Sequence, residues 1–130
     1  MRIQESAENY LEAIFILKKR KGYVRSIDIA TELGYSKPSV SRAMKLLREN
    51  SYVTVEADGA ILLTEAGQTI AAQMYERHTF LSRFLLDLGL DEQTAKEDAC
   101  RIEHVISEET FGRLKEYIES APQKAAQQST

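Results

Sequence analysis

The sequence predicts a mainly α-helical fold with one small β-hairpin, in which an N-terminal winged helix-turn-helix precedes an all-helical domain. Three observations predict it: two short helices joined by a tight glycine-containing turn, a hairpin signal directly after them, and amphipathic helical patterns in the rest of the chain. We expect the winged helix-turn-helix to cover residues 1–64 and the helical domain residues 65–121. Residues 122–130 lack a core-facing pattern, and we expect them to form a disordered tail.

The first three helices are predicted from the spacing of apolar residues and from the residues at their ends. Over residues 6–20 the apolar side chains recur every three or four positions, and Gly22 follows a basic run that ends this helix. Ser26 is expected to cap a second helix, which Gly34 ends, and Ser36 is expected to cap a third. The short turn between the second and third helices is typical of a helix-turn-helix.

A β-hairpin is predicted directly after the third helix. Residues 52–56 and 60–64 are rich in branched side chains and read as two strands, and the Asp58-Gly59 pair between them is a strong hairpin turn signal. Because a hairpin in this position is the wing of a winged-helix domain, the N-terminal part of the chain is predicted to bind DNA.

Three further helices are predicted after the wing. A long amphipathic pattern covers residues 65–88 and ends at Gly89. Asp91 is expected to cap the next helix, which runs to about Ile106, and Ser107 is expected to cap the last one. The long helix carries more apolar surface than one small domain needs.

Composition separates a basic region from an acidic one. The chain has 130 residues and a net charge of −3, but residues 1–50 hold ten Lys and Arg against six Asp and Glu, whereas residues 51–130 hold seven against fourteen. A basic N-terminal part suits an anionic partner. The N-terminus lacks the pattern of a secretory signal, no apolar run approaches the roughly 20 residues of a membrane span, and one cysteine suits a reducing compartment. We therefore expect a cytoplasmic protein with no membrane partner.

The residues expected to contact DNA lie mainly at the start of the third helix, which is the recognition helix. Arg42 is the strongest candidate for reading a base, because its guanidinium can bond both acceptors of guanine. Arg48 is a further candidate for the DNA backbone. The predicted DNA-binding residues are Arg25, Ser36, Lys37, Pro38, Ser39, Ser41, Arg42 and Lys45.

Three residues of the fifth helix have the spacing of metal ligands. Cys100, Glu103 and His104 lie at i, i+3 and i+4 and therefore share one helical face. A thiol, a carboxylate and an imidazole together suit a first-row transition ion better than calcium or magnesium. The triad alone is also compatible with a packed cysteine beside a solvated Glu-His pair.

Two weaker patterns accompany this triad, and one alternative competes with it. His78 interrupts an otherwise apolar helix, and Asn9 and Glu12 share a face of the first helix, where they are also compatible with ordinary surface polarity. Alternatively, Cys100 is a redox sensor whose thiolate is stabilised by Arg101 and His104, although the chain has no second cysteine to resolve a sulfenic acid. A metalloenzyme is not expected, because no Gly-rich loop, nucleophile motif or His-Glu-x-x-His pattern is present.

Taken together, several motifs resemble the diphtheria-toxin-repressor and manganese-transport-regulator (DtxR/MntR) family over about residues 4–120. The motifs are Glu8-Asn9-Tyr10-Leu11-Glu12, the Ser36-Lys37-Pro38-Ser39-Val40-Ser41 segment, the wing, Arg77-His78 and Ile102-Glu103-His104. The resemblance implies a short family member without an SH3-like domain, and Mn²⁺ or Fe²⁺ bound between a winged helix and a helical dimerisation domain. It implies metal ligands at Asn9, Glu12, His78, Cys100, Glu103 and His104.

Two of these positions depart from the manganese type, which carries an aspartate at Asn9 and a glutamate at Cys100. The iron-responsive type carries methionine and cysteine there, so the site is a hybrid in which Co²⁺ or Zn²⁺ can also substitute. A second site of the iron type is not expected, because its glutamate and histidine are replaced by Ser82 and Lys96. A pair of ions sharing Glu12, His78 and Glu103 stays open.

The function that follows is regulation of transcription in metal homeostasis. We expect a homodimer, formed through the helical domain, that binds palindromic operator DNA when Mn²⁺ or Fe²⁺ is bound. The resemblance implies repression, although the sequence does not distinguish repression from activation, nor does it identify the metal, the operator or the regulated genes.

Overall fold

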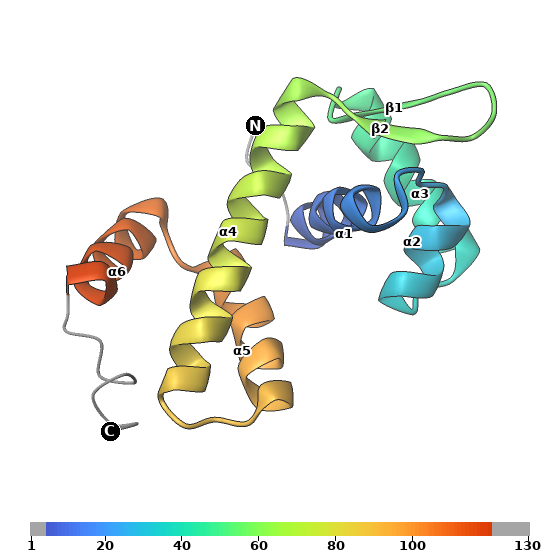
Figure 1. The fold of residues 1–130 in the computed structure, drawn as a ribbon. Coiled ribbons are helices and arrows are strands. Elements are labelled where there is room, and N and C mark those ends of the chain that lie inside the picture. The colour runs from blue at the N-terminus through green and yellow to red at the C-terminus, as the bar shows by residue number, and fades with distance from the viewer. Residues whose placement is uncertain (1–4, 121–130) are drawn as a thin grey trace. The chain divides into compact units, whose positions relative to one another are not determined.

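The computed structural model describes residues 5–120 and divides the chain into two compact units (Figure 1). The division falls between Tyr75 and Glu76, inside a long helix. The tail predicted at 122–130 lies outside the described residues. The predicted fold class is confirmed, because helices dominate both units and the strands form one hairpin.

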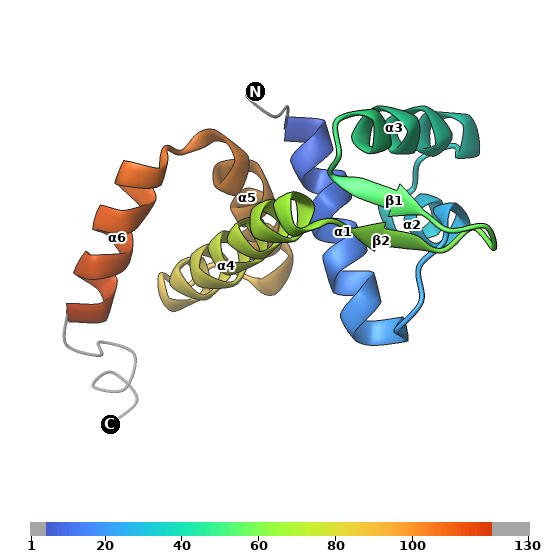
Figure 2. The same cartoon turned by 90° about the horizontal axis from the view of Figure 1, so that it is seen from above.

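The N-terminal unit has the element order of a winged helix-turn-helix. The elements are α1 (Glu5–Lys21), α2 (Ser26–Leu33), α3 (Lys37–Glu49), β1 (Val53–Val55), β2 (Ile61–Leu63) and the first turns of α4 (Glu65–Asp87). Helix α1 packs against α2, α3 and β2, and α3 packs against β1, as Figure 2 shows from above. The interior of this unit is an apolar cluster that includes the fully buried Leu11, Ile29 and Val40.

Local capping explains where the helices of the helix-turn-helix begin and end. The Ser36 hydroxyl accepts a hydrogen bond from the Ser39 N–H at 3.3 Å, as predicted. Gly34 ends α2 with a φ of 70°, a conformation that glycine adopts without strain. The prediction that Ser26 caps α2 is wrong. The capping position is Arg25, because the Asp28 carboxylate inside the helix accepts the Arg25 N–H at 2.9 Å.

The wing is a two-stranded antiparallel hairpin in which Val53 pairs with Leu63 and Val55 with Ile61. Both strands are one residue shorter at each end than predicted. The flanking backbone groups are nevertheless bonded, since the Glu56 N–H donates to the Ala60 carbonyl at 2.8 Å. The predicted turn at Asp58-Gly59 is confirmed, with Gly59 at a φ of 91°.

A close approach of two backbones joins the wing to α4. The Thr64 hydroxyl donates to the Ser51 carbonyl at 2.7 Å and accepts the Gly67 N–H at 3.2 Å. A Cβ atom on Gly67 would lie 2.1 Å from the Tyr52 carbonyl oxygen, which is far inside van der Waals contact. Only glycine fits this first turn of α4.

The C-terminal unit consists of the rest of α4 with α5 (Glu92–Val105) and α6 (Glu108–Ser120). The predicted caps are confirmed: the Asp91 carboxylate accepts the Thr94 N–H at 2.7 Å, and the Ser107 hydroxyl accepts the Thr110 N–H at 3.0 Å. Its apolar cluster is small and centres on the buried residues Leu81, Ala99 and Phe111.

Candidate metal centre and nucleic-acid interface

Helix α5 presents three possible ligand side chains to one point. Ligand atoms of Cys100, Glu103 and His104 all lie within 4.8 Å of one another. Glu103 has 0% of its surface exposed, and Cys100 and His104 are half-buried. This arrangement follows from the helical period, which places positions i, i+3 and i+4 on one face.

Helix α4 places a further residue of ligand type, His78, against Glu103 of this cluster. His78 Nδ1 lies 2.8 Å from Glu103 Oε1, although 25 residues separate them in the sequence. The His78 side chain is 23% exposed, so the contact is shielded but reachable from solvent. The C-terminal unit therefore gathers four of the six predicted ligands: His78, Cys100, Glu103 and His104.

The donor set fits a divalent transition ion. Two imidazoles, one thiol and one carboxylate are side chains that bind such ions in proteins, and the thiol makes the set softer than an all-oxygen site. Glu103 is fully buried, and burial of a carboxylate is costly unless a positive charge compensates it. A cation held by Cys100, Glu103 and His104 would add positive charge beside this carboxylate.

Arg77, next to His78, holds the end of α5 that carries the ligands. Arg77 Nη1 donates to the backbone carbonyls of Glu103 at 3.0 Å and Ile106 at 2.9 Å. The guanidinium carbon also lies 5.5 Å from the centre of the Phe111 ring in α6. Arg77 thus joins the three helices of the unit, a role that the sequence reasoning missed because its partners lie far along the chain.

The other two predicted ligands belong to α1 in the N-terminal unit. Glu12 is 5% exposed, and Asn9 is half-buried, with its amide Nδ2 donating to the Tyr35 hydroxyl at 3.4 Å. The convergence of Asn9 and Glu12 with the four predicted ligands of the C-terminal unit stays a prediction.

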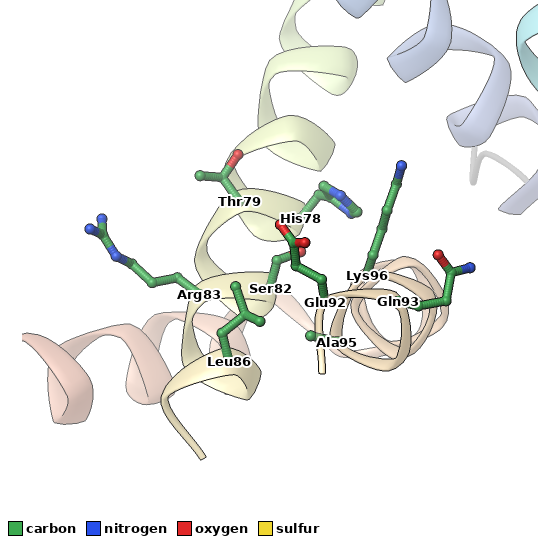
Figure 3. A pocket seen from close by; sticks show the side chains of 9 residues that line it. All are labelled: His78, Thr79, Ser82, Arg83, Leu86, Glu92, Gln93, Ala95 and Lys96. Atoms are coloured by element: carbon green, nitrogen blue, oxygen red, sulfur yellow. The ribbon is translucent and has the colours of Figure 1, made fainter. Parts of the chain in front are cut away.

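A pocket of about 600 Å³ lies beside His78 between α4 and α5. Figure 3 shows the Glu92 carboxylate pointing toward Ser82 and His78, whereas the Arg83 side chain points away from them. Lys96 also lines the pocket and brings a positive charge to it. Ser82 and Lys96 both line this pocket, and the absence of a second site of the iron type stays a prediction.

The residues predicted to read DNA lie on the exposed side of the first turns of α3. Lys37, Ser41, Arg42 and Lys45 are exposed, while Val40 on the opposite side is fully buried. Within this surface Arg42 Nη2 donates to Ser39 Oγ at 3.4 Å. Ser36 and Pro38 are exposed at the same helix end, and Arg25 is exposed just before α2. Binding of DNA by these residues stays a prediction.

Comparison with known proteins decides the family. Residues 2–61 match the iron dependent repressor N-terminal DNA binding domain, and residues 64–126 match the iron dependent repressor metal binding and dimerisation domain. The chain belongs to the iron-dependent repressor family. The predicted DtxR/MntR resemblance is thereby confirmed, and the members of this family are DNA-binding, metal-dependent transcriptional repressors, which are not enzymes.

Individual relatives agree with this assignment. The chain is 35% identical over 124 residues to an HTH-type transcriptional regulator of Methanocaldococcus jannaschii, covering 94% of this chain and 99% of that protein. It is 34% identical over 108 residues to the transcriptional regulator MntR of Escherichia coli, covering 83% of this chain and 70% of that protein.

A solved structure of the manganese regulator SloR is also similar to this chain. It has a TM-score of 0.79 and 28% sequence identity, and the match covers 93% of this chain. The chain spans 56% of the length of that protein, so what SloR does as a whole is not carried over from the match. Among residues 5–120 no helix is long and apolar enough to cross a membrane.

Proposed function

We propose that this family member is a repressor that binds palindromic operator DNA as a homodimer when Mn²⁺ or Fe²⁺ is bound, and so acts in metal homeostasis. The observation that carries the proposal is the contact of His78 with the buried Glu103 beside Cys100 and His104. These residues have the types and the spacing of ion ligands. They lie in the part of the chain that matches a metal-binding and dimerisation domain. Binding to DNA would place the protein in the cytoplasm.

The identity of the ion is proposed from the donor set. The Cys100 thiolate favours Fe²⁺, Co²⁺ or Zn²⁺, whereas the carboxylate oxygens of Glu103 and Glu12 also accept Mn²⁺. We therefore expect Mn²⁺ or Fe²⁺ to act in the cell and Co²⁺ and Zn²⁺ to substitute in solution. A Cys100→Glu variant should shift preference toward Mn²⁺, because it replaces a soft ligand with a hard one.

A contact in the N-terminal unit supports a link between the ligands of α1 and the recognition helix. Asn9 Nδ2 donates to the hydroxyl of Tyr35, which lies in the turn directly before the Ser36 cap of α3. The Tyr35 ring also packs edge-on against the Tyr10 ring, with their centres 5.7 Å apart. If Asn9 Oδ1 binds the ion, its amide nitrogen still reaches the turn that precedes α3.

Exposed apolar side chains of the C-terminal unit support the dimer. Leu88 is 64% exposed, Val105 71% and Tyr117 67%. Large exposed apolar side chains suit a protein interface. Their presence fits a unit that matches a dimerisation domain. In a dimer the two α3 helices would meet half-sites about one turn of DNA apart.

Metal binding to the ligand variants tests this function. Equilibrium dialysis of the reduced chain against Mn²⁺ and Co²⁺, with metal analysis, should give bound ion that is lost in His104→Ala. The matched control Glu97→Ala removes an exposed carboxylate of the same helix and should bind normally. Absence of bound ion in the unsubstituted chain, or equal binding in His104→Ala, would contradict the proposal.

The thiol-switch alternative finds no support in the comparisons. Cys100 lies among residues of metal-ligand type, and a thiol switch assigns no role to His78 or Glu103. Operator affinity measured with and without peroxide in Cys100→Ser separates the two functions. A metal sensor loses its metal response in this variant, whereas a thiol switch loses only its response to oxidant.

A further inference from the structure

The segment between α1 and α2 is tied to the wing and directs two side chains to solvent. The Ile61 N–H of β2 donates to the Val24 carbonyl at 2.8 Å, so this segment lies along the wing. Val24 is 1% exposed and packs inward. Because side chains alternate along extended backbone, its neighbours Tyr23 and Arg25 both lie on the outer side, and both are exposed.

Tyr23 and Arg25 make two contacts with each other. Arg25 Nε donates to the Tyr23 hydroxyl at 3.0 Å, and the guanidinium carbon lies 5.1 Å from the centre of the Tyr23 ring. Hydrogen bonding and ring contact together restrict a side chain that otherwise has many rotamers. The hydrogen bond uses only Nε, which leaves the four N–H groups of the two terminal nitrogens for a ligand.

The same pair lies against the turn of the wing. Arg25 Nε is 4.0 Å from the position that a Cβ on Gly59 would take. Asp58 Oδ1 accepts the Ala60 N–H at 3.1 Å, which shapes the turn. This N–H and then the Tyr23 hydroxyl are the main causes that lower the pKa of Asp58. The Tyr23 hydroxyl thus acts on Asp58 of the wing turn and accepts from Arg25.

We propose that Tyr23 is a positioning residue for DNA binding, because it holds the Arg25 guanidinium beside the wing turn with its terminal nitrogens available to a DNA phosphate. An arginine is permanently charged, and its fork matches a phosphate, so an arginine held in place loses less side-chain entropy on binding. The inference rests on the proposed DNA-binding function and adds Tyr23 to the residues that determine affinity.

A double-mutant cycle measures this role. The probe is a labelled duplex of ~30 base pairs selected from a random library with the Mn²⁺-loaded chain, a length that accommodates two half-sites. Anisotropy gives the affinity of the unsubstituted chain, Tyr23→Phe, Arg25→Gln and the double variant over a range of salt concentrations. Thermal melting checks that each variant is folded.

The expected results separate positioning from a structural role. Tyr23→Phe keeps the ring but loses the hydroxyl, and we expect about threefold to tenfold weaker binding. Arg25→Gln should lower the slope of log affinity against log salt by about 0.9, which corresponds to one phosphate contact. In the Arg25→Gln background, adding Tyr23→Phe should change affinity by less than about 1.5-fold, because Tyr23 acts through Arg25.

One control and two outcomes complete the test. Arg113→Gln removes the same group as Arg25→Gln from an exposed position of α6 and should leave the affinity and the salt slope unchanged. An unchanged affinity in Tyr23→Phe, or an equal loss in both backgrounds, overturns the proposal while the DNA-binding function stands. If the unsubstituted chain binds no duplex in the presence of metal, both the Tyr23 proposal and the DNA-binding function are overturned.

Discussion

The two units differ in what fills their interiors. Among residues 5–120 the N-terminal unit contains a cluster of fourteen buried apolar residues, whereas the cluster of the C-terminal unit has three, and beside them lies the fully buried Glu103. Burial of this apolar surface favours the folded state of the winged helix. The helical unit has the smaller apolar cluster and encloses the Glu103 carboxylate, so we expect a bound ion to stabilise it more than the winged helix.

The largest effect is expected from Glu103→Gln, which tests the polar interior directly. The amide retains the shape and a hydrogen bond to His78 but removes the charge that attracts a cation. Mn²⁺ affinity should fall at least about 100-fold, and added metal should no longer raise the melting temperature. Calorimetric titration and thermal melting measure both, and Glu97→Gln on the exposed side of α5 is the matched control. Wild-type metal affinity in Glu103→Gln would contradict this account.

Gly67→Ala tests the packing of the N-terminal unit. The added Cβ would lie 2.1 Å from the Tyr52 carbonyl oxygen, so the backbone must shift, and stability should fall by about 1–3 kcal/mol. The matched control is Gly112→Ala in α6, where nothing lies within 4 Å of the new Cβ and alanine should stabilise the helix by roughly 0.5–1 kcal/mol. Urea denaturation measures both changes, and equal effects of the two substitutions would refute the close approach.

Arg77→Met tests whether Arg77 holds the C-terminal unit together. It removes the donor to the Glu103 and Ile106 carbonyls, and we expect a loss of about 1–2 kcal/mol. Hydrogen exchange should increase in α5 and α6 and remain unchanged in α2 and α3. Arg83→Met, at an exposed position of the same helix, is the control. Equal increases in hydrogen exchange in both units would show that Arg77 does not act on the C-terminal unit alone.

The smallest effect is expected from the pH dependence of two acidic residues, one in each unit. The Lys21 ammonium and then the Arg25 N–H lower the pKa of Asp28, and the Thr94 N–H and then its hydroxyl lower the pKa of Asp91. A folded-state pKa below the unfolded value of about 3.9 stabilises the fold above that value, and this stability is lost as the pH falls through the folded-state pKa.

Urea denaturation of the metal-free chain at pH 6 and pH 3 measures this dependence. Asp28→Asn and Asp91→Asn should each lose less stability than the unsubstituted chain between these two pH values. Between pH 5 and pH 8 the two carboxylates should add no pH dependence. A larger loss of stability between pH 6 and pH 3 in either variant than in the unsubstituted chain would show that the carboxylate does not stabilise the fold in its ionised form.

Features that depend on residues close together in the sequence could be predicted. Caps at Ser36 and Asp91 and the turn at Asp58-Gly59 depend on neighbours within a few residues, so local patterns revealed them. The ligand triad of α5 was predictable for the same reason, because the helical period alone places its members together. Its contact with His78 was expected only from the family resemblance.

The contacts that escaped prediction join residues distant in sequence or depend on backbone geometry. Arg77 donates hydrogen bonds to carbonyls 26 and 29 residues away. Gly67 is required because the Tyr52 carbonyl lies close to it. The cap of α2 was assigned to Ser26 because serine is the commoner capping residue, whereas Asp28 supplies the acceptor from within the helix. Such contacts carry no periodic signal and emerge only when the chain is folded.

An anaerobic operator titration tests whether a divalent ion bound at Glu103 controls DNA binding by the winged helix. Affinity for the selected duplex is measured in chelator and with Mn²⁺, Fe²⁺, Co²⁺ and Zn²⁺, for the unsubstituted chain and Glu103→Gln. We expect at least about tenfold tighter binding with Mn²⁺ or Fe²⁺, equivalent to about 1.4 kcal/mol of coupling, and no metal response in Glu103→Gln. Equal operator affinity in chelator and in every metal would contradict it.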